Sequence, residues 1–240
     1  DHPQLEVFEE SKHGILYRAF EDELNMDQPK SVAGVDYFDA PTCASCHMSA
    51  GGNQGVTHDV GKRLSWNLRA PVSKKMKDSE KKRAAMVEVC TACHAGDFVN
   101  GFYKQLDEFV DLYDTKFGIP AKAIRDDLHK AGVIPEGNFN DEIDWIYWEL
   151  WHHEGRRARH GAAMSGPDYA WWHGLYDVAK HFYTEYLPAA KKLSEEAGKP
   201  EVYEKIVKDY LESDPRHDWY LNGFDKQKLE EIQKYYQERY

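Results

Sequence analysis

The stretches Cys43-Ala44-Ser45-Cys46-His47 and Cys90-Thr91-Ala92-Cys93-His94 decide how this chain folds, because they repeat one spacing, Cys-x-x-Cys-His, and use all four cysteines of its 240 residues. Histidine is one residue in 20 here (12 of 240), so chance places it after both pairs only about once in 400. Two thiols at this spacing form thioethers with the vinyl groups of one heme, and the next imidazole binds the iron. We therefore predict two covalently attached hemes c, and the residues that hold them are Cys43, Cys46, Cys90 and Cys93 as attachment sites and His47 and His94 as proximal ligands.

Two other uses of paired cysteines have to be weighed against heme attachment. Two Cys-x-x-Cys motifs also suit a zinc ion bound by four thiolates, and four cysteines also suit two disulfides. Neither use requires a histidine directly after each pair. The heme interpretation is therefore favoured.

Composition and charge indicate an exported redox protein. No apolar run approaches the length that spans a membrane. The net charge of −11 disfavours nucleic acid and anionic membranes as partners, and the lysine-rich segment 74–83 is interpreted as a solvated helix start. Heme attachment of this type takes place outside the cytoplasm, yet Asp1-His2-Pro3-Gln4 is not a signal sequence. We expect that a signal was removed or lay on a preceding piece.

The pattern of helix formers and breakers predicts a mainly α fold. Gly, Pro and Asn indicate an irregular loop over 35–70, with its most flexible point at 51–55, and a helix from Ser79 whose last turn carries the second motif. No strand-like alternation persists. We divide the chain into a diheme region, 1–100, and a long-helix region, 101–240, in which the predicted helices 141–163 and 169–197 pair as a hairpin. After Ser79 the predicted helices cover 102–117, 121–131, 141–163, 169–197, 201–211 and 226–240.

The surplus of histidines offers further iron ligands. His13 and His58 stand beside small or capping residues that let a porphyrin approach, so they are predicted as distal ligands. His153 and His160 are seven residues apart and share a helix face, which suits either heme ligands or a wet, charged surface. Met48 and Met164 are interpreted as packing residues. The histidines outside the two motifs are His2, His13, His58, His129, His152, His153, His160, His173, His181 and His217.

Longer runs of sequence resemble the octaheme hydroxylamine oxidoreductase family, of which hydrazine dehydrogenase is a close relative. The most specific run is Trp151-His152-His153-Glu154-Gly155-Arg156-Arg157-Ala158-Arg159-His160-Gly161-Ala162-Ala163-Met164, followed by Gly166-Pro167-Asp168-Tyr169 and Trp172-His173-Gly174. The resemblance extends to 1–4, 11–14, 34–48, 57–59 and 63–66. It covers nearly the whole chain.

The resemblance implies an arrangement larger than this chain. Family members carry eight hemes, seven with two histidine ligands and one catalytic heme with an open position, and this chain has only the last two attachment motifs. It looks like the C-terminal portion of such an enzyme, whether cut, split into a subunit or incompletely recorded. Tyr169 occupies the place of a tyrosine that bonds covalently to the catalytic heme of a neighbouring subunit in a trimer, and His173, with His153 or His160 or both, is expected to ligate hemes anchored elsewhere.

The resemblance also implies a function. Relatives that lack the tyrosine tend to act as reductases, so Tyr169 favours oxidation of a small nitrogenous substrate, hydroxylamine, to nitric oxide or nitrite, with a soluble cytochrome c as electron acceptor. The expected compartment is the periplasm or, in an anammox bacterium, the anammoxosome. The family's catalytic Asp-His pair lies upstream of this segment. Oxidation of hydrazine to dinitrogen, and a plain two-heme electron carrier, remain alternatives.

Overall fold

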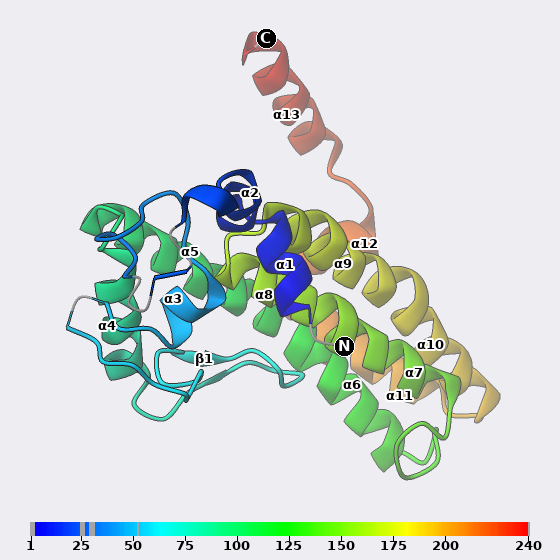
Figure 1. Cartoon of the computed structure of the whole chain (residues 1–240). Helices are drawn as coiled ribbons and strands as arrows, with labels where there is room; N and C mark the ends of the chain where they lie inside the picture. Colours follow the sequence, from blue (N-terminus) through cyan, green and yellow to red (C-terminus); the bar gives the residue numbers. More distant parts are fainter. Residues whose placement is uncertain (1–2, 25–26, 29–31, 52, 240) are drawn as a thin grey trace. The chain divides into compact units, whose positions relative to one another are not determined.

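The computed structural model describes residues 3–24, 27–28, 32–51 and 53–239 and is mainly α-helical, as predicted (Figure 1). Two compact units divide it, Asp1–Asp114 with Glu149–Val178 and Thr115–Trp148 with Ala179–Tyr240. The boundary predicted at residue 100 divides a heme-attachment region from a subunit-contact region by function. This division stays a prediction. His2, and with it the start of the segment 1–4 that resembles the hydroxylamine oxidoreductase family, lies outside the described residues.

The first unit combines short helices, an irregular stretch and longer helices. Ser11 begins α2 because its hydroxyl accepts a hydrogen bond from the Gly14 amide (3.2 Å). The irregular stretch, blue to cyan in Figure 1, contains α3 and a two-stranded antiparallel ladder. The elements are α1 (Gln4–Glu10), α2 (Lys12–Ala19), η1 (Glu21–Glu23), α3 (Cys43–His47), β1 (Trp66–Asn67), β2 (Lys74–Lys75), α4 (Ser79–Cys90), α5 (Gly96–Tyr113), the π-helical η3 (Glu149–Glu154), α8 (Gly155–Ala163) and the π-helical η4 (Asp168–Tyr176).

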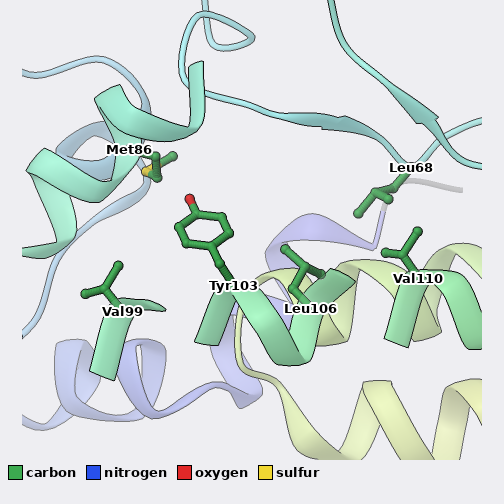
Figure 2. Close-up of a cluster of buried hydrophobic side chains, with 6 residues drawn as sticks. All are labelled: Leu68, Met86, Val99, Tyr103, Leu106 and Val110. Atoms are coloured by element: carbon green, nitrogen blue, oxygen red, sulfur yellow. The ribbon is translucent and has the colours of Figure 1, made fainter. Parts of the chain in front are cut away.

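The core of this unit forms on one face of α5. Val99, Tyr103, Leu106 and Val110 recur at helical spacing and are all buried. Figure 2 shows the Tyr103 ring directed toward Met86 of α4, and Leu68 facing α5 near Val110. Cys46 and Cys90 pack against the edge of this cluster, so α5 supports both heme motifs.

A hairpin of α8 and η4 packs through residues without bulky side chains. A Cβ added to Gly161 would lie 2.4 Å from the Ala170 nitrogen, and one added to Gly174 would lie 2.6 Å from the Ala158 Cα. Between them Ser165 adopts φ +55°, which reverses the chain, and the Gly166 amide donates to the Gly161 carbonyl (2.8 Å). The predicted hairpin is therefore present, and its two segments touch backbone to backbone.

The second unit is a bundle of α6, α7, α10 and α11. Proline stands in the first turn of α11, where no amide partner is lost, and α6 and α10, which also have a proline in their first turn, each follow directly on a π-helical segment. The Tyr186 hydroxyl donates to the Ala121 carbonyl inside the bundle (2.8 Å). The elements are η2 (Asp114–Gly118), α6 (Ile119–Lys130), α7 (Glu142–Trp148), α9 (Asp177–His181), in which the chain enters this unit, η5 (Phe182–Tyr186), α10 (Leu187–Glu196), α11 (Pro200–Ile206), η6 (Val207–Leu211), η7 (Pro215–His217), α12 (Asp218–Asn222) and α13 (Lys226–Arg239).

Most predicted helices occur within a few residues of their expected ends. The helix predicted from 102 begins six residues earlier, at Gly96. Ala95, directly after the second motif, has an extended backbone, and the next residue starts α5. The structure adds α1, α2 and the short β1 and β2 strands, which pair Trp66 with Lys75. No described helix has the length and apolarity needed to cross a membrane.

We predict opposite effects for one substitution at two glycines. Gly174→Ala forces a Cβ into the Ala158 backbone and should lower the free energy of unfolding by about 1–3 kcal/mol. Gly101→Ala on α5 meets no atom within 4 Å and should raise it by up to about 1 kcal/mol. Chemical denaturation measures both, and equal effects would contradict the packing of α8 on η4.

Candidate heme sites

The first motif forms a single helical turn with a reciprocal capping box at its N-terminus. The Thr42 hydroxyl accepts from the Ser45 amide (3.2 Å), and the Ser45 hydroxyl accepts from the Thr42 amide (2.9 Å). The Tyr37 hydroxyl also forms a hydrogen bond with the Ser45 hydroxyl. Cys43 and Cys46 therefore project from one turn of α3, as attachment to a single heme requires.

His47 is held in the orientation of an iron ligand. Its Nδ1 lies 3.3 Å from the Val60 carbonyl, which fixes the tautomer and leaves Nε2 for metal. Burial lowers the pKa of His47, so the neutral imidazole that binds metal is favoured. The proximal role predicted for His47 therefore fits its surroundings.

Arg63 organises the loop around this motif. Its side chain is 1% exposed, and Nη1 donates to the Cys46 carbonyl (2.9 Å) while Nη2 donates to those of Ser49 (2.7 Å) and Gly55 (3.2 Å). Irregular backbone leaves carbonyls without partners, and a buried guanidinium supplies donors for several of them. The loop is thereby fixed without a β-ladder.

The second motif starts at the last residue of α4. The His94 amide donates to the Cys90 carbonyl (3.0 Å), which closes the turn between the two cysteines. Gly34, at φ +78°, approaches this turn so closely that a Cβ there would lie 2.8 Å from the Ala92 carbonyl oxygen. Because Tyr37 touches the first motif, residues 34–37 contact both.

The four thiols are unpaired, and Cys46 lies beside Cys90. Burial, with the nearby Cys90, raises the pKa of the Cys46 thiol to about 12. Among the described residues no group of three or more His, Cys, Asp or Glu side chains is placed to hold a metal ion.

The structure brings His13 to the second motif. The ring centres of His13 and His94 are 5.9 Å apart. Two metal–nitrogen bonds of about 2 Å, together with the two ring radii, separate paired imidazole ligands by about 6 Å between centres. His13 on α2 and His94 therefore fit as the two ligands of one iron. Phe98 stacks on His94 at 4.9 Å.

The other predicted ligands have different surroundings. His58 is exposed in the loop after the first motif, and the Thr57 amide ties this loop to the Met48 carbonyl (2.8 Å). His160 has its Nδ1 on the Arg156 carbonyl (2.8 Å), and burial lowers its pKa to about 4. His153 lies in the π-helical η3, so its expected alignment with His160, worked out for an unbroken α-helix, does not carry over. These three ligand assignments stay predictions.

Tyr169 and His173 lie together on η4, with ring centres 6.2 Å apart. The backbone bends at His173, where φ is −84° and ψ is 18°. His173 Nδ1 is 2.6 Å from an Asp168 carboxylate oxygen, and both side chains are about half exposed. A carboxylate at Nδ1 orients an imidazole and leaves Nε2 for metal, which is the arrangement that His173 needs as a ligand.

Sequence reasoning missed the residues that support the ligands. These are Tyr37, Val60, Arg63, Phe98 and Asp168. Asp168 stands in the recognised Gly-Pro-Asp-Tyr segment. It precedes His173 by five residues, the spacing of a hydrogen bond in a π-helix, so the sequence did contain a signal for this pair. His47 contacts the backbone carbonyl of Val60, which any residue would supply, so the residue type at position 60 could not predict this contact.

We predict that His13→Ala keeps both covalent hemes and turns the heme of the second motif partly high-spin. The cysteines and His94 remain, whereas the second strong ligand is lost. His58→Ala should do the same to the heme of the first motif. Electron paramagnetic resonance measures the spin states, with His181→Ala as the control. Entirely low-spin spectra for both variants would show that neither histidine is a ligand.

A second prediction concerns Asp168. Asp168→Asn keeps a hydrogen-bond acceptor for His173 but removes the charge that makes the imidazole more basic. The reduction potential of one heme should rise, and spectroelectrochemistry would detect it. Glu185→Gln is the matched control, because Glu185 lies 3.5 Å from His181, which is not an assigned ligand. Unchanged reduction potentials in the Asp168 variant would show that Asp168 does not act on the ligand of any heme.

Three comparisons with known proteins show what this chain is similar to. The family described as "Seven times multi-haem cytochrome CxxCH" matches residues 1–141. A "probable nitrite reductase-hydroxylamine oxidoreductase fusion protein" of Kuenenia stuttgartiensis is 28% identical over 138 residues, which cover 46% of this chain and 16% of that protein. The chain thus spans about a sixth of this relative's length.

Two solved structures share the fold at 20% identity. One is a "hypothetical multiheme protein" with a TM-score of 0.71, over 81% of this chain and 53% of the other. The second is a "reducing HAO-like protein complex" of Kuenenia stuttgartiensis with a TM-score of 0.66, over 82% and 54%. The match over residues 1–141 and the two Cys-x-x-Cys-His turns lead to one conclusion: this chain belongs to the multi-haem CxxCH cytochrome family and is a relative of the hydroxylamine oxidoreductases.

Proposed function

We propose that this chain is part of a multiheme oxidoreductase that oxidises hydroxylamine, to nitric oxide or nitrite, and passes the electrons through c-type hemes. The observation that carries the proposal is the η4 segment, in which Tyr169 follows the Ser165–Gly166 turn and lies one turn before His173. The fusion protein whose name includes hydroxylamine oxidoreductase supports the same class of chemistry.

The residues of this chain divide into attachment, ligation and substrate-side roles. Heme c, when bound, supplies reversible one-electron chemistry at iron. Cys43 with Cys46 and Cys90 with Cys93 would hold two hemes, with His47 and His94 as proximal ligands. His13 fits the second heme, and we assign His58 to the first. We assign the ligands of hemes anchored elsewhere to His153, His160 and His173.

Tyr169 has the role nearest to the substrate. In this proposal its ring bonds to the catalytic heme of a neighbouring subunit in a trimer, which ties the subunits covalently. A bond from tyrosine to the porphyrin distorts the macrocycle and changes its electronics, two means by which a protein tunes iron chemistry. Tyr169 is half-buried, with the half-exposed ring of His173 next to its own, so its ring lies near the surface of this unit.

The proposed setting follows from the attachment chemistry. Covalent heme attachment of this kind takes place after export, so we place the protein in the periplasm or, in an anammox bacterium, in the anammoxosome. Electrons would leave to a soluble cytochrome c. Hydrazine oxidation to dinitrogen by the same architecture remains the alternative, and so does a plain two-heme electron carrier.

Tyr169→Phe tests the proposal against a close control. The variant lacks the phenolic oxygen and should lose the covalent trimer in denaturing, reducing gels, together with at least about tenfold of its hydroxylamine oxidation. The bis-histidine heme spectra should be unchanged. Tyr176→Phe, an exposed tyrosine of the same segment, should keep the trimer and the activity.

The outcomes separate the alternatives. Assays of the wild-type protein with hydroxylamine and with hydrazine identify the substrate. Wild-type chains that separate cleanly, with no porphyrin mass on the Tyr169 peptide, would remove the main support for an oxidase. Nitrite reduction by the same protein would then indicate a reductase, and the absence of both activities an electron carrier.

A further inference from the structure

Three aromatic side chains gather on the surface of the second unit. Phe139 lies 4.4 Å from Trp145 and 6.2 Å from Trp148 between ring centres, and the two tryptophans are 6.3 Å apart. Phe139 is 44% exposed and Trp145 is 52% exposed. We call these three residues the aromatic platform. Large exposed aromatic side chains in contact with one another are typical of interaction sites.

The backbone under the platform is strained. Phe139 adopts φ +60°, in the left-handed region that bulky residues rarely enter. Gly137, two residues earlier, has φ +105°. Such strain persists only where the surroundings enforce it, and it concentrates at binding and switch regions. The strain at Phe139 therefore indicates that the exposed position of its ring serves a function.

A network of polar groups enforces this conformation. Arg125 donates from Nε to the buried carboxylate of Asp144 (2.7 Å) and from Nη2 to the Gly137 carbonyl (2.8 Å). The Asn140 amide also donates to Asp144 (3.2 Å), and its side chain donates to the Glu136 carbonyl (2.6 Å). The loop is thus fixed before any partner arrives, which lowers the entropy cost of binding.

The charged side chains of the segment that carries the platform, 131–148, are all acidic. Residues 131–148 include no lysine or arginine, and Glu136, Asp141 and Glu142 make no ion pair within the described part of the chain. Glu142 precedes Trp145 by three residues, which places it on the same face of α7, and Asp141 stands directly before this helix. Among nearby cations, Arg125 is paired with Asp144, and Lys199 donates to the Ala131 and Gly132 carbonyls.

We propose that the aromatic platform docks a basic face of a partner protein, with a lysine or arginine of the partner stacked on Phe139 and Trp145. A cation over an aromatic ring is attracted by the ring quadrupole, most strongly by Trp, and Glu142 and Asp141 add charge complementarity. A second copy of this chain fits the platform poorly, because it brings a net charge of −11 to a surface of the same sign.

Titration calorimetry of the heme-loaded protein with a peptide of five Arg-Lys repeats tests the proposal. The peptide should bind, and its affinity should fall as salt is added. Trp145→Ser and Glu142→Lys should each weaken binding by about tenfold or more. The matched controls are Phe224→Ser, an aromatic that is 73% exposed, and Glu196→Lys on α10, and both should bind as the wild type does.

Phe139→Gly separates binding from folding. It removes one ring of the platform and relieves the strained φ, so binding should weaken while the midpoint of thermal unfolding stays the same or rises. Equal losses in the control variants, or equal binding of a Glu-Lys repeat peptide, would overturn the proposal. So would sedimentation that shows self-association of the wild-type chain lost in the Trp145 variant, because the platform would then bind a second copy.

Discussion

The close approach of His13 to His94, with ring centres 5.9 Å apart, is the constraint on which much of the first unit depends. A low-spin heme needs a strong ligand on each side, and the second motif supplies only one. We propose that His13 of α2, near the beginning of the chain, is the other. Its position is fixed by the Ser11 cap and by Gly14, where a Cβ would lie 2.0 Å from the Phe8 carbonyl oxygen. The N-terminal helices thus place His13 beside the second motif.

Buried arginines hold the backbone around these sites. Arg63 and Arg159 are among the largest fully buried side chains. Arg159 donates to the Ala70 carbonyl and the Ser73 hydroxyl (both 2.9 Å), and its guanidinium lies 4.1 Å from the centre of the Tyr113 ring. Irregular loops leave many carbonyl groups unpaired, and each buried one needs a donor. Two guanidinium groups provide such donors, so the loops keep their shape without long strands.

Sequence reasoning reached the parts of this architecture that have a local signal. The heme motifs, the mainly α fold and the α8–η4 hairpin were all predictable, because each rests on residue spacing or on a Gly-Pro start signal. Two kinds of feature had no such signal. The pairing of His13 with His94 joins residues far apart in the chain, and His58 had an equal claim from sequence alone. The π-helical turn at η3 also changes which residues share a face, and no local pattern announces it.

The central claim, that this chain attaches two hemes through its two Cys-x-x-Cys-His turns, is most directly tested by intact-mass spectrometry of the denatured chain with peptide mapping. The account predicts the mass of the polypeptide plus two hemes, with one heme on the peptide of Cys43 and Cys46 and one on the peptide of Cys90 and Cys93. A chain with unmodified thiols, with disulfides or with zinc as its bound metal would contradict it.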